Sequence, residues 1–136
     1  MALNSYGTIM AHAIAIEDSL TRFYQKFADQ DEAFGDYAKR YAKRKTRIEA
    51  VRKDYVTEMI LEPISGLNID DYSVQPDEQA ANRAAMLAEA IRLEATAEKF
   101  YAETSLKLNV TEAIRTFQKF AQENAERLEE LKSFAS

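Results

Sequence analysis

Residues 13–24, AIAIEDSLTRFY, return later in the chain as residues 90–101, AIRLEATAEKFY. Both stretches keep a glutamate followed seven positions later by a tyrosine, as Glu17 with Tyr24 and Glu94 with Tyr101. A repeat of this length that recurs once is typical of a duplicated helical hairpin, whereas a solenoid repeats many times. The sequence therefore predicts two related halves.

Composition favours a single all-helical domain. The 136 residues can bury one core, and three glycines and two prolines among many alanines, glutamates, lysines and leucines favour helix throughout. There is no cysteine, so the chain can form neither a disulfide nor a thiolate metal site. Without a long apolar run or a signal-peptide pattern, we expect a soluble cytoplasmic domain, and the net charge of -5 implies no special partner.

Apolar residues spaced by three or four predict helices over about 6–29, 32–60, 78–107 and 111–134. Asn4 or Ser5 can cap the first helix and Asp31 the second. The turn before the second helix is so short that the first two helices must be antiparallel neighbours. The inward positions are Ile9, Ala13, Ile16, Leu20, Tyr24, Phe27, Phe34, Tyr37, Tyr41, Ile48, Val51, Tyr55, Met59, Met86, Ala90, Leu93, Ala97, Phe100, Tyr101, Ile114, Phe117, Phe120, Ala121, Leu128 and Leu131.

The helical pattern breaks over about 61–77, where Pro63, Gly66 and Pro76 occur. We expect this crossover to pack along the bundle, because it carries its own apolar residues: Ile64, Leu67, Ile69, Tyr72 and Val74. Two hairpins joined by one long crossover is the connectivity of ferritin-like bundles. A simple up-down-up-down bundle, with the loop wandering over one end, is the alternative.

In its repeat, helix order and helix lengths the chain resembles the ferritin-like superfamily, and within it the rubrerythrin-like proteins. Tyr41-Ala42 and Phe120-Ala121 also match the family's lead-in to its metal ligands. The resemblance implies a core that holds two iron ions, with one Glu from each of two helices and a Glu-x-x-His pair from each of the other two. Glu17 and Glu94 match the single glutamates, and Glu98 is similar to an additional carboxylate of rubrerythrins.

The remaining ligand positions have all changed. By the resemblance, the two Glu-x-x-His pairs fall on Lys45 with Ile48 and on Asn124 with Arg127. Charged Lys and Arg have no lone pair to offer a metal. Because a lost metal would leave buried carboxylates uncompensated, we expect Lys45 and Arg127 to be internal counter-ions of Glu17 and Glu94.

Other arrangements of these residues stay open. The cations and glutamates can instead extend to solvent, or Glu94 and Glu98, with Glu123 or Asn124, can hold one hard cation such as Mg, Ca or Mn. His12 is expected to be a surface or internally bonded histidine. The pocket aromatics Tyr24, Tyr41 and Tyr101 are expected to be core residues whose hydroxyls bond to Glu17 or Glu94.

The second helix is strongly basic, with Lys39, Arg40, Lys43, Arg44, Lys45, Arg47, Arg52 and Lys53 against Glu49. We interpret this as pairing with the acidic fourth helix, although an anion- or nucleic-acid-binding face is an alternative. No nucleophile–base pair or phosphate loop indicates a catalytic residue. The sequence thus predicts a metal-free, non-enzymatic scaffold or binding protein without cofactor, which the resemblance suggests is a homodimer with an unknown protein partner. The alternative is an iron or manganese oxidoreductase or peroxidase that uses Glu17, Glu94 and Glu98.

Overall fold

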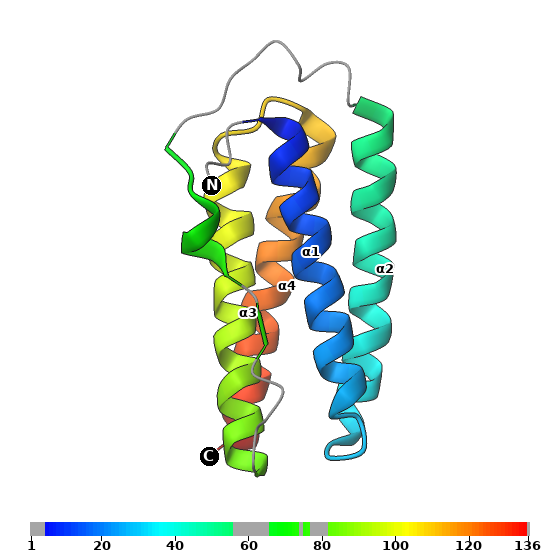
Figure 1. Ribbon diagram of the computed structural model, residues 1–136, viewed down its shortest axis with the longest axis vertical. Coiled ribbons are helices and arrows are strands. Elements are labelled where there is room, and N and C mark those ends of the chain that lie inside the picture. Colours follow the sequence, from blue (N-terminus) through cyan, green and yellow to red (C-terminus); the bar gives the residue numbers. More distant parts are fainter. Residues whose placement is uncertain (1–4, 56–65, 74, 77–81, 136) are drawn as a thin grey trace.

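The chain folds into a bundle of four α-helices (Figure 1). The computed structural model describes residues 5–55, 66–73, 75–76 and 82–135. Within these residues there is no strand, and the elements are α1 (Tyr6–Lys26), α2 (Glu32–Tyr55), the short 3-10 helix η1 (Ile69–Tyr72), α3 (Arg83–Ser105) and α4 (Thr111–Ala135). The prediction of an all-α bundle is confirmed.

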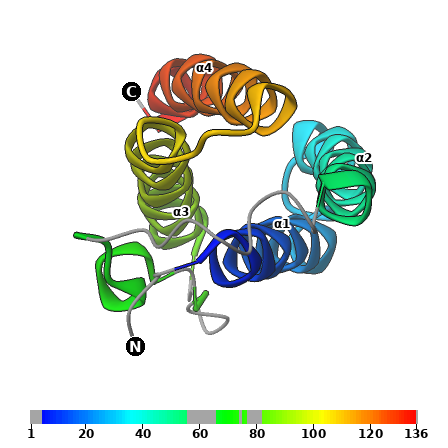
Figure 2. The ribbon, with the colours of Figure 1, turned by 90° about the horizontal axis from the view of Figure 1, so that it is seen from above.

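The helices form two antiparallel hairpins, α1 with α2 and α3 with α4, and contacts are densest within each hairpin. In Figure 1, α1 runs downward, α2 and α3 both run upward, and α4 runs downward. Helix α2 therefore ends at one end of the bundle and α3 begins at the other. This is the predicted crossover connectivity, and the up-down-up-down alternative is wrong. Viewed along its length, the bundle places α1 beside α3, with α2 and α4 on the opposite side (Figure 2).

Local hydrogen bonds fix where the helices begin. Ser5 and Thr8 form a capping box, in which the Thr8 amide donates to Ser5 Oγ at 3.1 Å and the Ser5 amide donates to Thr8 Oγ1 at 3.2 Å. Asp31 Oδ1 accepts the Ala33 amide at 2.9 Å, which confirms the predicted cap of α2.

Some helix ends differ from the prediction. Helix α3 begins at Arg83 instead of residue 78, because Asn82 has an extended backbone and its side chain accepts the Ala85 amide at 2.8 Å. Helix α1 ends at Lys26 instead of residue 29, where Ala28 and Gln30 enter a turn. The predicted end of α2 at residue 60, with Met59, lies outside the described residues.

The crossover packs against the bundle where the structure describes it, as predicted. Leu67 and Tyr72 are buried, and Tyr72 donates to Glu103 of α3 at 2.6 Å. The Tyr72 carbonyl accepts from His12 Nε2 of α1 at 2.8 Å, so η1 is held to both hairpins. Ile64, Val74 and the side chain of Ile69 lie outside the described part of the chain.

Candidate functional site

Two fully buried glutamates lie in the core of the bundle, Glu17 on α1 and Glu94 on α3. Each accepts a hydrogen bond from the tyrosine of the other repeat. Tyr101 donates to Glu17 Oε2 at 2.6 Å, and Tyr24 donates to Glu94 Oε2 at 2.5 Å. In two antiparallel helices a step of seven residues forward along one matches a step of seven residues back along the other. The repeated glutamate–tyrosine spacing therefore produces both contacts at once.

The counter-ion of Glu17 is Arg44, not Lys45. Arg44 Nε lies 2.7 Å from Glu17 Oε1, and Arg44 Nη2 donates to Glu17 Oε2 at 2.9 Å, so the guanidinium meets both carboxylate oxygens. Arg44 is 7% exposed. Lys45 is 36% exposed, and its Nζ pairs instead with Asp18 Oδ1 on the bundle surface at 3.2 Å. The prediction for Lys45 is thus wrong.

The predicted buried cation of α2 lies one residue too far along the helix. The inward stripe of α2 runs through Tyr41, Arg44 and Ile48, which are all buried, at steps of three and four. Lys45 follows Arg44 and lies about 100° further around the helix. The family's lead-in pattern sets the ligand spacing from Ala42, whose side chain is exposed here. Continuing the apolar spacing from Tyr41 would have placed Arg44 in the core.

Asn124 of α4 links the two glutamates. Its Nδ2 donates to Glu94 Oε1 at 2.8 Å, and its Oδ1 accepts from Arg44 Nη2 at 3.0 Å. Tyr41 also donates to Glu94 Oε1. With the hydroxyl of Tyr24, this gives Glu94 three donors, so the carboxylate is bonded without a cation in direct contact.

Glu17, Glu94, Arg44 and Asn124, with the tyrosines bonded to them, form one buried polar layer. Arg127 of α4 is buried near this layer, but it does not form the predicted ion pair with Glu94. Its guanidinium carbon lies 4.2 Å from the centre of the Tyr37 ring and 5.6 Å from that of Tyr41. Burial disfavours the charged form of Arg127, but Tyr41 and the negative charge of Glu94 outweigh this and leave its pKa above the ordinary value. Arg127 therefore compensates Glu94 through the field across Tyr41.

Burial controls the titration of the layer. It raises the pKa of Glu17 above 4.5, although Arg44 and the Tyr101 hydroxyl oppose the shift. Burial also raises the pKa values of Tyr24, Tyr41 and Tyr101 well above 10.0, and the neighbouring glutamates add to this effect. The three hydroxyls therefore keep their protons at neutral pH and act as donors to the carboxylates.

The other predicted residues lie outside the layer or add no polar group to it. Ile48 is a fully buried apolar residue, and Glu98 is half-buried outside this hydrogen-bond network. His12 donates from Nε2 to the Tyr72 carbonyl, and its ring packs edge-on against Phe100. This agrees with the prediction of an internally bonded histidine.

The donor set does not fit the family's pair of metal ions. Both oxygens of Glu17 face the Arg44 guanidinium, and the oxygens of Glu94 accept from three uncharged donors. Among the residues that the structure describes, no three His, Asp or Glu side chains gather where they could hold a metal ion. A second cation placed between the glutamates would meet the positive charge of Arg44.

Fold and core together define an all-α four-helix bundle with two buried carboxylates, one paired with Arg44 and the other bonded by two tyrosines and an asparagine. Compared with protein-family models, with curated proteins and with solved structures, the chain matches none. Over the described residues, each helix is too short or too polar to cross a membrane.

Proposed function

We propose that the chain is a ferritin-like bundle of the rubrerythrin-related kind, without a metal centre, that acts as a non-enzymatic scaffold or binding protein. The observation that carries this proposal is the ion pair of Arg44 with Glu17, in which Nε and Oε1 are 2.7 Å apart in the core. A protein side chain supplies the positive charge that metal ions supply in the family that the sequence resembles.

The rest of the layer supports the same reading. Removing a metal from buried carboxylates leaves negative charge in a medium of low polarity, which is costly unless it is paired or hydrogen-bonded. Glu17 has an arginine, and Glu94 has two tyrosines and an asparagine. A layer in which both carboxylates are bonded in this way needs no metal ion to compensate its charge.

Gene duplication of one hairpin is the origin we propose for the fold. The exchanged contacts, Tyr24 with Glu94 and Tyr101 with Glu17, are what two copies of one hairpin related by a twofold axis would make. We also propose, from the resemblance alone, that the protein is a cytoplasmic homodimer.

The competing function is an iron or manganese oxidoreductase or peroxidase of the rubrerythrin kind. It would use Glu17, Glu94 and Glu98 as surviving ligands. The position of Glu98 outside the central network and the guanidinium beside Glu17 both argue against it.

Metal analysis tests the choice between the two functions. Protein purified without chelator is analysed for iron and manganese, and is then titrated anaerobically with Fe²⁺ and Mn²⁺ while its thermal unfolding is followed. We expect far less than one equivalent of metal per chain and no rise in the unfolding temperature. About two equivalents per chain, with peroxidase activity that depends on them, would overturn the proposal.

The variant Arg44→Met serves as the matched comparison. It removes the internal cation and keeps a long apolar side chain, so any affinity for Mn²⁺ should increase in the variant relative to the wild-type protein. Equal binding of Mn²⁺ to both proteins would show that Arg44 does not occupy the place of a metal.

A further inference from the structure

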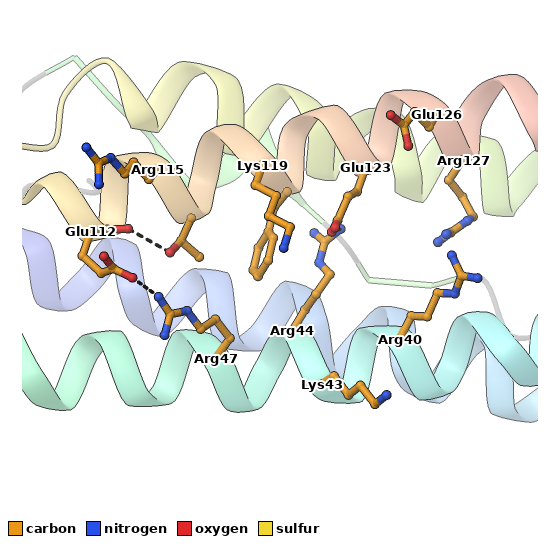
Figure 3. Close-up of a pocket in the computed structure, with 12 residues that line it drawn as sticks. Arg40, Lys43, Arg44, Arg47, Glu112, Arg115, Lys119, Glu123, Glu126 and Arg127 are labelled. Carbon is orange, nitrogen blue, oxygen red and sulfur yellow. Dashed lines mark hydrogen bonds and ion pairs between the residues drawn. The ribbon is translucent and has the colours of Figure 1, made fainter.

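Helices α2 and α4 make few direct contacts, and a groove of about 660 Å³ lies between them. This volume is in the range of small-molecule sites, roughly 300 to 1,000 Å³. Figure 3 shows the charged side chains of both helices along it. The lining residues are mostly basic: Arg40, Lys43, Arg44, Arg47, Arg115, Lys119 and Arg127, with Glu112, Glu123, Glu126, Thr116 and Phe120.

Part of this positive charge is already neutralised. Arg44 belongs to the core ion pair with Glu17, and its Nη1 also lies 3.5 Å from Glu123 Oε1. Arg47 pairs with Glu112 across the groove, and Arg40 pairs with Asp36 on its own helix at 3.1 Å. Lys119 and Arg127 of α4 form no ion pair with any carboxylate in the described ranges, so the groove keeps an excess of positive charge.

Arg127 is the residue that points most clearly to a ligand. It is 7% exposed, and its buried Nε makes no hydrogen bond within the described part of the chain. The face of its guanidinium is covered by the Tyr37 ring. In Figure 3 Arg127 of α4 points across the groove toward Arg40 of α2. The Nε of Arg40 pairs with Asp36 Oδ2 on its own helix at 3.1 Å, whereas Arg127 has no such partner among the described residues. A buried donor without a partner, such as the Nε of Arg127, favours binding of an acceptor, and the basic side chains around it favour one with negative charge.

We infer that the groove between α2 and α4 binds a small phosphorylated organic molecule. Its phosphate oxygens accept hydrogen bonds from Arg127 and Arg40, and its body lies toward Phe120, with any second acidic group near Lys119. Guanidinium groups match phosphate oxygens in geometry, and two of them converge here. The inference rests on the proposed function as a binding protein and names the class of ligand for it.

The two other occupants fit less well. A second copy of this chain would set one basic groove against another, and like charges across an interface oppose association. A nucleic acid would need exposed aromatic rings for base stacking or an open basic face. Phe120, the aromatic residue of the groove, is only 4% exposed, and Arg127 lies too deep for a duplex to reach.

Titration calorimetry with inorganic pyrophosphate and with fructose 1,6-bisphosphate, at low salt and without divalent cations, tests the inference. The wild-type protein should bind at least one of the two probes with one site per chain. Lys119→Ala should weaken that binding about tenfold, which corresponds to about 1.4 kcal/mol. Lys132→Ala removes the same charge from an exposed position of α4 that does not line the groove, and it should bind as the wild type does.

Two further variants test the depth of the site. Arg40→Ala changes an exposed side chain and should weaken binding about tenfold without affecting the fold. Arg127→Met keeps the packing against Tyr37 and should abolish binding, provided that its helical circular dichroism matches the wild type.

Several results would overturn the inference. They are no binding of either probe at millimolar concentration, equal weakening by Lys119→Ala and Lys132→Ala, or tighter binding of single-stranded DNA that falls steeply with salt. These binding results say nothing about metal content, so the proposal of a metal-free bundle would remain. Conversely, two equivalents of metal would refute that proposal whatever the groove binds.

Discussion

Arg44 meets Glu17 with its Nε 2.7 Å from Oε1, and the two side chains are 7% and 0% exposed. A buried ion pair of this kind contributes little compared with an apolar replacement of both partners. Removing only one partner is costly, because it leaves the other charge buried and unpaired. The stability of this bundle should therefore depend strongly on keeping both residues or neither.

Arg44→Met should lower the free energy of unfolding by about 3 to 5 kcal/mol, because the Glu17 carboxylate loses its cation. Lys45→Ala should lower it by less than about 1 kcal/mol, since Lys45 forms a surface pair with Asp18. Urea unfolding followed by circular dichroism measures both. The double variant Glu17→Gln with Arg44→Met should recover part of the loss, and an additive double variant would contradict direct pairing.

The hydrogen bonds from Tyr24 to Glu94 and from Tyr101 to Glu17 should contribute more to the free energy of unfolding than a hydrogen bond at the bundle surface. Tyr24→Phe and Tyr101→Phe each remove a donor from a buried carboxylate and should each cost about 1.5 to 3 kcal/mol of unfolding free energy. Tyr37→Phe is the matched control, because Tyr37 is buried but donates to Glu130, whose carboxylate is exposed. Water can replace the lost donor there, so we expect a cost below about 1 kcal/mol. The idea fails if all three variants lose the same stability.

The repeat and the spacing of apolar residues were sufficient to predict the helices, their pairing and the crossover. They were sufficient because each helix buries one continuous stripe. The predicted inward positions whose side chains the structure describes are buried or packed against the core, while the side chain of Tyr55 lies outside the described part. Helix ends were less predictable. Asn82 caps α3 inside a run that reads as continuous helix, and only the backbone turn at that residue reveals the cap.

For the centre of the layer, the kind of side chain beside Glu17 could be predicted, but the residue of α2 that supplies it could not. The sequence predicted a basic side chain beside Glu17 in the core, and the structure places one there, but one residue earlier than predicted, at Arg44. Asn124 was identified as a changed ligand position, but its two hydrogen bonds to opposite halves depend on how the hairpins meet, which no spacing within one helix specifies. The groove depends in the same way on the separation of α2 from α4.

His12 gives an independent test of the crossover, because it is the single histidine of the chain and its ring protons can be followed by NMR without ambiguity. Burial lowers its pKa below 6.5, although the hydrogen bond to the Tyr72 carbonyl opposes the shift. The unfolded chain then binds the proton more tightly than the folded one. The stability that His12 contributes is therefore present above pH 6.5 and is lost as the pH falls through its folded pKa.

The measured midpoint of the His12 titration should lie below 6.5. In His12→Gln, the free energy of unfolding should depend less on pH between neutrality and mild acid than in the wild type. A midpoint at or above 6.5 would mean that the ring is open to solvent or faces a negative charge, and that η1 does not pack as described.

The titration of Glu17 tests whether burial or Arg44 has the larger effect on the pKa of this carboxyl group. Burial raises the pKa of Glu17 above 4.5 despite Arg44, so the folded state binds this proton more tightly than the unfolded chain. The contribution of Glu17 to stability is then complete below pH 4.5 and is lost as the pH rises through its folded pKa.

Subtracting the unfolding free energy of Glu17→Gln from that of the wild type at each pH isolates this contribution, because the amide keeps the shape of the carboxyl group and does not titrate. The difference should fall as the pH rises toward neutrality, and in an Arg44→Met background it should fall further, since the cation that opposes the shift is gone. A difference that rises with pH would mean that Arg44 depresses the pKa of Glu17, and that the ion pair stabilises the core more than burial of the carboxylate destabilises it.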